Sequence, residues 1–463
     1  MKRSLLEASI NRRQLLKWAS GASLGGSSLT AALGGLSALG TSSALAAGPD
    51  SSYRALVCVY LLGGNDAFNM LVPSDAAGYN QYQQARVRLA VPQAGLLPIR
   101  PRSTDGRSFG FHSSMTEMQN LFGLGRLAVV ANVGTLLAPT SKAEYESGHN
   151  LPPQLFSHSD QSDQWMMGRP EGLDLQGWGG RLGDLLQAQN QANGLSINIS
   201  LDGDNVFQTG GAVVPYSLDV NGVQQFNRLN EPHEAGRIAA FQAMLDEGLA
   251  SSNLLERQSA EATRLSRSLS ELMRNSLAQA GGFTASFPDT PLGNQLKMVA
   301  NLISVRSRLG AKRQIFFVSM GGFDTHDQQP EVQPRLFSEV SQALYAFYRA
   351  TVELGVAESV TTFTQSEFGR TLTNNDNGTD HGWGSHHMVM GGAVQGGDIY
   401  GRMPQLSIGG PDDTSDGHVI PTTSTYQYAA TLGQWLGASA ADVATLFPNL
   451  SRFDRPNLGF LSP

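Results

Sequence analysis

The sequence predicts an α/β fold in which helices cover both faces of a mostly parallel β-sheet, forming a three-layer α/β/α sandwich. Short, nearly continuous apolar runs end in Gly-rich or polar turns, a pattern typical of strands that are buried on both faces. Stretches with apolar residues at helical spacing lie between these runs. Strands that alternate with helices favour a parallel sheet.

Six apolar runs are predicted to form the strands. The first, residues 54–62 (R-A-L-V-C-V-Y-L-L), ends in the turn Gly63-Gly64-Asn65-Asp66. The other predicted strands cover residues 126–133, 195–201, 313–320, 360–364 and 387–390. Polar residues follow several of these runs, so they are expected at the carboxyl ends of the strands.

The predicted helices cover residues 113–124, 160–167, 234–280, 296–309, 336–353, 425–436 and 441–446. Residues 234–280 have the pattern of one or two long amphipathic helices that end at Gly281-Gly282. Together with a β-rich stretch at 202–225, they predict an insertion at about 202–290. We expect residues 47–463 to form a single α/β domain that carries this insertion.

Residues 1–46 predict a signal peptide for the twin-arginine pathway. Arg12-Arg13 precedes a weakly apolar run, and Ala44-Leu45-Ala46 offers a small-x-small cleavage site. Gly and Ser interrupt the run too often for a membrane span, although an uncleaved N-terminal anchor is the alternative. The expected location is therefore periplasmic or secreted, with the twin-arginine translocon as a partner during export.

Charge and cysteine content narrow the possible partners. The chain has a net charge of −7, and the predicted signal segment holds five basic residues and one acidic residue, so the mature chain would carry −11. No basic run remains, which argues against nucleic acid and anionic membrane surfaces. Cys58 is the single cysteine, so no internal disulfide can form, and its apolar neighbours predict a buried side chain.

Carboxylates follow three separate predicted strands: Asp66, Asp324 and Glu367. Because the carboxyl ends of parallel strands share one edge of a sheet, these acids are expected to converge there. A divalent metal would offset their repulsion. His326 lies two residues after Asp324, a spacing that places both side chains on one side of an extended chain.

The Gly- and Asn-rich segment 365–387 adds further candidate ligands. Asp380 and His381 form one candidate pair, and three of the nine histidines of the chain lie within residues 381–387. His386 and His387 are adjacent, so in a strand they face opposite ways and at most one is expected in the site. Taken alone, each motif has a plainer interpretation as a turn or a surface hydrogen bond.

Candidate nucleophiles precede the predicted helix 160–167. Ser157, His158 and Ser159 lie where backbone N–H groups and the helix dipole stabilise an anion, although a helix cap by either serine is the alternative. Arg370 is a candidate for neutralising a substrate oxyanion, with a structural salt bridge as the alternative. Of the other histidines, His112 fits a helix entry, with a place in the cleft as the alternative, whereas His149, His233 and His418 fit surface or loop positions.

Four motifs together resemble a known family. V-Y-L-L-G-G-N-D-A-F-N, L-F-S-H-S-D-Q, G-G-F-D-T-H and G-T-D-H-G-W-G-S-H-H resemble the domain-of-unknown-function 1501 family of exported bacterial proteins, over essentially the whole mature chain. That family is similar in turn to the alkaline phosphatase and sulfatase superfamily. The resemblance implies an alkaline-phosphatase-like α/β/α sandwich with a two-metal site, which hydrolyses phosphate or sulfate esters or transfers phosphoryl groups.

The resemblance also implies roles for single residues. Asp66 matches the metal ligand after the first strand, Asp324 and His326 the later ligand pair, and His381 the last histidine ligand. The nucleophile would lie near residues 157–159. Glu367-Phe368 stands where an Asp-His pair is usual, and the C/S-x-P-x-R signature of the common sulfatases is missing, which argues against an ordinary sulfatase.

The sequence therefore predicts an exported, metal-dependent hydrolase of phosphate or related esters. Two divalent ions are expected, with zinc, calcium, magnesium and manganese as the candidates. The expected substrate is a small-molecule or polymer ester. The alternative is a non-catalytic exported binding or structural protein on a degenerate hydrolase scaffold, which the replaced Asp-His pair and the uncertain nucleophile support.

Overall fold

The computed structural model describes residues 53–103, 106–169, 171, 175–223 and 232–462. The predicted signal peptide, residues 1–46, lies outside these residues. Within the described part, no helix is both long and apolar enough to cross a membrane. The described residues divide into two compact units: the larger lies within residues 53–223 and 272–462, and the smaller consists of residues 232–271.

The larger unit is built on a nine-stranded sheet with the order β11-β5-β10-β9-β1-β8-β6-β7, in which β12 also pairs with β5. Neighbouring strands are parallel, except that β10 runs antiparallel to both β5 and β9. The strands are β1 Arg54–Leu61, β5 Leu127–Gly134, β6 Asn198–Ser200, β7 Tyr216–Ser217, β8 Arg313–Met320, β9 Val360–Gln365, β10 Ser385–Gly391, β11 Ile399–Tyr400 and β12 Thr423–Ser424.

The central strands end together at one edge of the sheet. Leu61 of β1 pairs with Met320 of β8, and Tyr60 pairs with Gln365 of β9. The loops that follow these three strands therefore leave the sheet side by side. Because β10 is antiparallel, the segment that enters it arrives at the same edge. The connection from β9 to β10 therefore has both its ends at this edge, and the register brings three distant stretches of the chain to one place.

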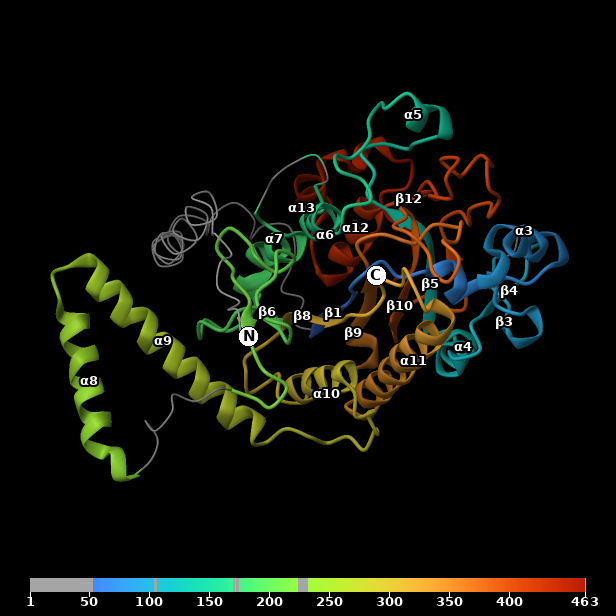
Figure 1. Ribbon diagram of the computed structural model, residues 1–463. Coiled ribbons are helices and arrows are strands. Elements are labelled where there is room, and N and C mark those ends of the chain that lie inside the picture. The colour runs from blue at the N-terminus through green and yellow to red at the C-terminus, as the bar shows by residue number, and fades with distance from the viewer. Residues whose placement is uncertain (1–52, 104–105, 170, 172–174, 224–231, 463) are drawn as a thin grey trace, which may run out of the picture. The chain divides into compact units, whose positions relative to one another are not determined.

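Helices cover both faces of the sheet, which confirms the predicted α/β fold with its three layers (Figure 1). One layer contains α4 Thr116–Gly123, α10 Pro291–Ser304 and α11 Gln329–Glu353. The other contains α6 His158–Met167, α7 Trp178–Leu186, α12 Thr425–Leu436 and α13 Ala440–Leu446. Short helices α2 Ala67–Met70 and α5 Lys142–Glu146 lie in the connections.

A second, small sheet was not predicted. It has the order β2-β4-β3 and consists of β2 Leu71–Pro73, β3 Leu97–Ile99 and β4 Phe109–Phe111. Helix α3, Ala76–Arg86, follows β2 and was not predicted either. Its buried residues are Tyr79, Tyr82, Ala85 and Arg86, of which only Ala85 is aliphatic, so the apolar signal of this helix is weak.

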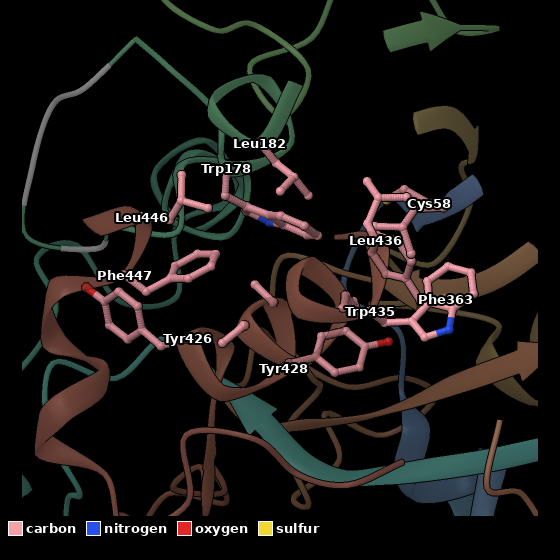
Figure 2. Packing of buried hydrophobic residues seen from close by; sticks show 14 of the residues in the cluster. Cys58, Trp178, Leu182, Phe363, Tyr426, Tyr428, Trp435, Leu436, Leu446 and Phe447 are labelled. Carbon is pink, nitrogen blue, oxygen red and sulfur yellow. The ribbon is translucent and has the colours of Figure 1, made fainter. Parts of the chain in front are cut away.

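Large aromatic side chains fill the core between the sheet and the layer that contains α7 and α12 (Figure 2). The ring of Trp178 lies 5.8 Å from that of Phe363, and the ring of Tyr428 lies 6.0 Å from the same Phe363 ring. Cys58 is fully buried in this core, as predicted, and burial raises the pKa of its thiol. This packing fixes β1 and β9, whose ends carry the candidate site.

The smaller unit contains α8, Ala235–Ala250, and most of α9, Leu254–Leu277. Within it, the guanidinium of Arg267 lies 5.4 Å from the ring centre of Phe241. The described residues of this unit, 232–271, lie within the range of the predicted insertion, about 202–290. The predicted β-rich stretch at 202–225 contributes only the short strand β7 among the described residues.

Candidate metal centre

Three histidine rings converge on one carboxylate at the edge where the strands end. His158 is the first residue of α6, Asp324 and His326 follow β8, and His381 precedes β10. Their Nε2 atoms lie 3.4 Å (His158), 3.1 Å (His326) and 3.5 Å (His381) from Asp324 Oδ1. The Nε2 atoms of His326 and His381 are 2.9 Å apart. Four potential metal ligands therefore face one small space.

The other ring nitrogen of each histidine has an acceptor of its own. The pairs are His158 Nδ1 with Glu367 Oε1 (2.9 Å), His326 Nδ1 with Asp380 Oδ1 (3.0 Å) and His381 Nδ1 with the Phe156 carbonyl oxygen (2.7 Å). A carbonyl or an ionised carboxylate only accepts hydrogen bonds, so each Nδ1 donates. In the neutral rings, each Nε2 then presents a lone pair to the shared space.

This arrangement fits a divalent metal ion. Two bare Nε2 atoms 2.9 Å apart repel each other unless a proton or a cation lies between them. In a tetrahedral zinc site with bonds of 2.0–2.1 Å, the ligand atoms are about 3.3 Å apart. The three contacts of Asp324 with the histidines and the His326–His381 contact, at 2.9–3.5 Å, are close to this value. The ligand atoms of His158, Asp324 and His381 all lie within 4.8 Å of one another; His326 is not part of this set and joins it through its contacts with Asp324 and His381. Acceptors on the outer ring nitrogens are also typical of metal-binding histidines.

The Gly63-Gly64 turn holds Glu367 beside His158. The Gly63 amide donates a 2.8 Å hydrogen bond to Glu367 Oε1, the same oxygen that accepts from His158. Gly63 has φ +116°, and a Cβ there would lie 2.3 Å from the amide nitrogen of Asp324. Only glycine allows this close approach in that conformation. The turn after β1 therefore shapes the centre through its backbone.

Arg370 keeps the Asp324 carboxylate ionised. Its Nη1 atom donates a 2.8 Å hydrogen bond to Asp324 Oδ1, and its side chain is 0 % exposed. Burial alone would raise the pKa of Asp324, but the hydrogen bond and charge of Arg370, with smaller effects of His158 and His326, lower it below the ordinary value. Asp324 is consequently available as an anionic ligand.

Phe368 supports two of the three rings. Its ring centre lies 4.8 Å from that of His381, in a stacked arrangement, and 4.8 Å from that of His158. Phe368 is fully buried. The aromatic residue that replaces the usual histidine after Glu367 therefore packs behind the centre, a role that the sequence analysis did not predict.

The structure places Asp66 in a different environment. Its Oδ2 atom is paired with the Arg86 guanidinium and accepts a hydrogen bond from Gln329 Nε2, and the Asp66 and Arg86 side chains are fully buried. Among the described residues, the group with ligand atoms within 4.8 Å of one another contains His158, Asp324 and His381. A buried guanidinium thus neutralises Asp66. Because α3 was not predicted, Arg86 was not considered as its partner.

The two serines beside His158 have different surroundings. Ser157 is the N-cap of α6: its Oγ atom accepts from the Asp160 amide and also bonds the Asp160 side chain. Ser159 is exposed, and its Oγ atom lies 3.3 Å from that of Ser157. His158 alone of these three candidates reaches the cluster.

His386 and His387 lie in the core. The Nδ1 atom of His386 accepts a 2.9 Å hydrogen bond from the Asn132 amide. The ring of His387 packs against Trp165 and Tyr428. Burial lowers the pKa of each histidine to about 3, with His386 adding to the effect on His387. Both rings are therefore neutral parts of the core.

An unusual backbone conformation precedes His158. Phe156 has φ +69°, which is uncommon for a large side chain. Its carbonyl oxygen is the acceptor that orients His381, and its ring lies 4.1 Å from that of His418. His418, predicted to be a surface or loop residue, lies in a loop and is half-buried behind Phe156. Such a conformation beside a cluster of ligands is consistent with a functional constraint.

Comparisons with known proteins identify a family. The model of the family described as "Protein of unknown function (DUF1501)" matches residues 53–419. No curated protein matches the chain.

Several solved structures share a remote likeness. The crystal structure of Ps i-CgsB matches with a TM-score of 0.38 and 8 % identity, over 88 % of this chain and 78 % of that one. BT1596, a 2-O GAG sulfatase, matches with a TM-score of 0.32 and 10 % identity, over 86 % and 75 %. The lipoteichoic acid synthase LtaP from Listeria monocytogenes matches with a TM-score of 0.34 and 7 % identity, over 85 % and 74 %.

Proposed function

The chain belongs to the DUF1501 family, and from the geometry of its histidine–aspartate cluster we propose that it is an exported, metal-dependent hydrolase of phosphate or related esters. The observation that carries the proposal is the convergence of three Nε2 atoms on Asp324 Oδ1, at 3.1–3.5 Å. The motifs that resemble hydrolases of the alkaline phosphatase and sulfatase superfamily suggest the ester substrate.

The proposed ligands are His158, Asp324, His326 and His381. Three imidazoles and one carboxylate suit zinc better than magnesium or calcium, which prefer sites made of oxygen ligands. We propose one ion rather than two, because Arg86 already neutralises the Asp66 carboxylate. The bound ion would supply Lewis acidity toward an ester oxygen and toward water.

The remaining residues orient these ligands. Glu367 and Asp380 hold the outer nitrogens of His158 and His326. Arg370 is completely buried against Asp324, which favours the structural salt bridge over direct binding of a substrate oxyanion. The side chain of Asp324 is 47 % exposed and that of His326 is 42 % exposed, so solvent reaches the cluster from the side of these two residues.

Water is the nucleophile that fits this arrangement best. The hydroxyl of Ser157 is engaged by Asp160 as a helix cap, and His158 uses Nδ1 to bond Glu367 while Nε2 faces the proposed ion. The exposed Ser159 hydroxyl also donates to Asp160 Oδ2, at 3.3 Å. Water can enter the open side of the cluster directly.

The metal content of purified mature protein tests the proposal, together with hydrolysis of phosphomonoesters, phosphodiesters and sulfate esters. We expect about one equivalent of divalent metal and hydrolysis of at least one ester class. His381→Ala should lose the metal, whereas His149→Ala, an exchange at an exposed histidine in the α5 connection, should retain it. A chain that binds no divalent metal would contradict the hydrolase proposal.

Metal binding without ester hydrolysis would support the alternative, an exported binding protein on a hydrolase scaffold. The replacement that favours this alternative is visible in the structure. Phe368 occupies the position after Glu367 and packs against the rings of His158 and His381 instead of offering a further ligand. The ester panel separates the two functions, since the metal site is common to both.

A further inference from the structure

The Arg370 guanidinium is held mainly by one residue, Thr379. Arg370 Nε donates a 3.2 Å hydrogen bond to Thr379 Oγ1, and Nη2 donates to the Thr379 carbonyl oxygen. Nη1 faces the other way and donates to Asp324 Oδ1 (2.8 Å) and to the Gly63 carbonyl oxygen (3.1 Å). The position of Thr379 therefore determines how Arg370 meets the Asp324 carboxylate.

Thr379 is held in turn by Gln329, the first residue of α11. The Thr379 hydroxyl donates a 2.7 Å hydrogen bond to Gln329 Oε1, and the Thr325 hydroxyl donates to the same oxygen at 3.0 Å. A hydroxyl has one hydrogen, so a Thr379 hydroxyl that donates to Gln329 keeps its lone pairs for Arg370 Nε. The Gln329 acceptor thus sets the direction of the Thr379 hydroxyl.

The far end of Gln329 is anchored in the core. Its Nε2 atom donates a 2.5 Å hydrogen bond to Asp66 Oδ2, the oxygen that pairs with Arg86. Arg86 Nη1 also donates to the Thr371 carbonyl oxygen at 2.7 Å. Because Asp66 needs a donor and the two threonines need an acceptor, the amide of Gln329 has one favourable orientation. Gln329 and Asp66 are both essentially excluded from solvent.

We propose that Gln329 is a positioning residue of the metal centre, the link through which the buried Asp66–Arg86 pair holds Thr379, Arg370 and finally Asp324. The inference rests on the proposed function, because it assumes that Asp324 is a ligand. It assigns Asp66 the role of an anchor in place of a ligand. The chain Asp66–Gln329–Thr379–Arg370–Asp324, called the Gln329 relay below, crosses three segments that are distant in sequence.

Cobalt binding by the metal-free protein tests the relay. Partners that orient metal ligands typically contribute 10–100-fold to metal affinity, and Gln329 acts through two intermediates, so we expect Gln329→Leu to weaken Co²⁺ binding by about 10-fold. The visible absorption spectrum of bound Co²⁺ should change as well, because the position of the Asp324 carboxylate changes. A loss of packing alone would leave that spectrum unaltered.

Gln208→Leu is the matched control. Gln208 is fully buried, and its Nε2 atom donates to the Ile199 and Ile315 carbonyl oxygens, neither of which belongs to the relay. Its replacement removes a buried amide of the same size but keeps the bond between Gln329 and Thr379. We expect thermal stability to fall in both variants and the Co²⁺ spectrum to change only in Gln329→Leu.

A second pair of variants tests the link at Thr379. Thr379→Val removes the hydroxyl at nearly constant volume and should reproduce the Co²⁺ defect of Gln329→Leu, whereas Thr379→Ser restores the hydroxyl and should restore binding. The double variant Gln329→Leu/Thr379→Val should bind Co²⁺ about as strongly as each of the two single variants. Losses that simply add would overturn the relay, as would a Co²⁺ affinity of Gln329→Leu within twofold of wild type.

If the proposed metal site is wrong, the wild-type chain itself binds no Co²⁺. The relay can then still be tested by the stability of the metal-free protein. Gln329 and Arg370 are joined only through Thr379 in the relay, so unfolding free energies of Gln329→Leu, Arg370→Met and the double variant should be non-additive. Additive free energies would contradict the relay whether or not metal binds.

Discussion

At the scale of single residues, the buried carboxylate of Glu367 orients the ring of His158, one of the proposed metal ligands. One of its oxygens accepts from both the Gly63 amide and His158 Nδ1. The sequence analysis predicted Glu367 itself as a ligand, since it follows a strand that ends at the site. In the structure it lies behind His158, where it fixes the tautomer that leaves Nε2 bare.

Glu367→Gln is expected to weaken metal binding by about 10–100-fold without unfolding the protein. The amide keeps an oxygen for Gly63 but removes the charge that holds the His158 ring. Competition with a chelating dye measures the affinity. Glu358→Gln is the control, because Glu358 is an exposed residue paired with Arg126. Equal affinities of Glu367→Gln and wild type would contradict the assigned role of Glu367.

Gly63→Ala is expected to destabilise the fold by about 1–3 kcal/mol, the usual cost of a disfavoured backbone conformation. The added Cβ would lie 2.3 Å from the Asp324 amide nitrogen, at a residue with φ +116°. Chemical denaturation measures the loss. Gly123→Ala, in α4, is the control, because a Cβ there meets no atom within 4 Å. A loss no greater than that of the control would show that the turn relaxes.

At the scale of elements, Ser157 at the start of α6 has two candidate roles, helix cap and nucleophile, which substitutions can separate. As the N-cap, Ser157 stabilises the helix, and Ser157→Ala should cost about 0.5–2 kcal/mol, which Ser157→Asp should recover. With water as the nucleophile, Ser157→Ala should retain most of the hydrolytic rate. A loss of 1,000-fold or more in kcat, with stability restored in Ser157→Asp but activity still absent, would identify the hydroxyl as the nucleophile instead.

The elements that could be predicted from the sequence are those with a strong apolar signal. The run at 313–320 has the bounds of β8, and the run at 54–62 ends within one residue of β1. Helix α11 begins at Gln329, seven residues before the predicted start. The prediction missed its first two turns because they are mostly polar and contain prolines. Helix α3 was missed for a related reason, since tyrosines and Arg86 make most of its buried face.

The candidate site could be located but not resolved into roles. Strand ends predicted that Asp66, Asp324 and Glu367 gather at one edge with His326, and the Gly-rich segment added Asp380 and His381. Of these, the structure brings Asp324, His326 and His381 into direct contact. His158 was predicted near the site as a nucleophile, whereas its Nε2 atom faces Asp324 with the others. Which side chain points inward depends on partners such as Arg86 and Glu367, and these contacts join residues that sequence spacing does not relate.

At the scale of the whole molecule, two neutral histidines tie stability to pH. His386 and His387 are fully buried on β10, and burial lowers the pKa of each from 6.5 to about 3. Between these values the unfolded chain binds protons at both positions and the folded chain does not. The free energy of unfolding therefore rises with pH in this range. The contribution of the two neutral rings is fully present above about pH 6.5 and is lost as the pH falls toward 3.

Each of these histidines should contribute a slope of about 1.4 kcal/mol per pH unit to the free energy of unfolding between about pH 6 and pH 4. His387→Phe should remove one such contribution, because phenylalanine fills the space beside Trp165 and Tyr428 without a group that titrates. Denaturant unfolding of the metal-free protein at several pH values measures the slope. Metal is left out because its binding at the proposed ligands His158, His326 and His381 would add a pH dependence of its own. The exposed His149→Ala variant should leave the slope unchanged. If His387→Phe retains the full wild-type slope, the proton uptake on unfolding comes from other groups, and His387 is charged or accessible in the folded chain.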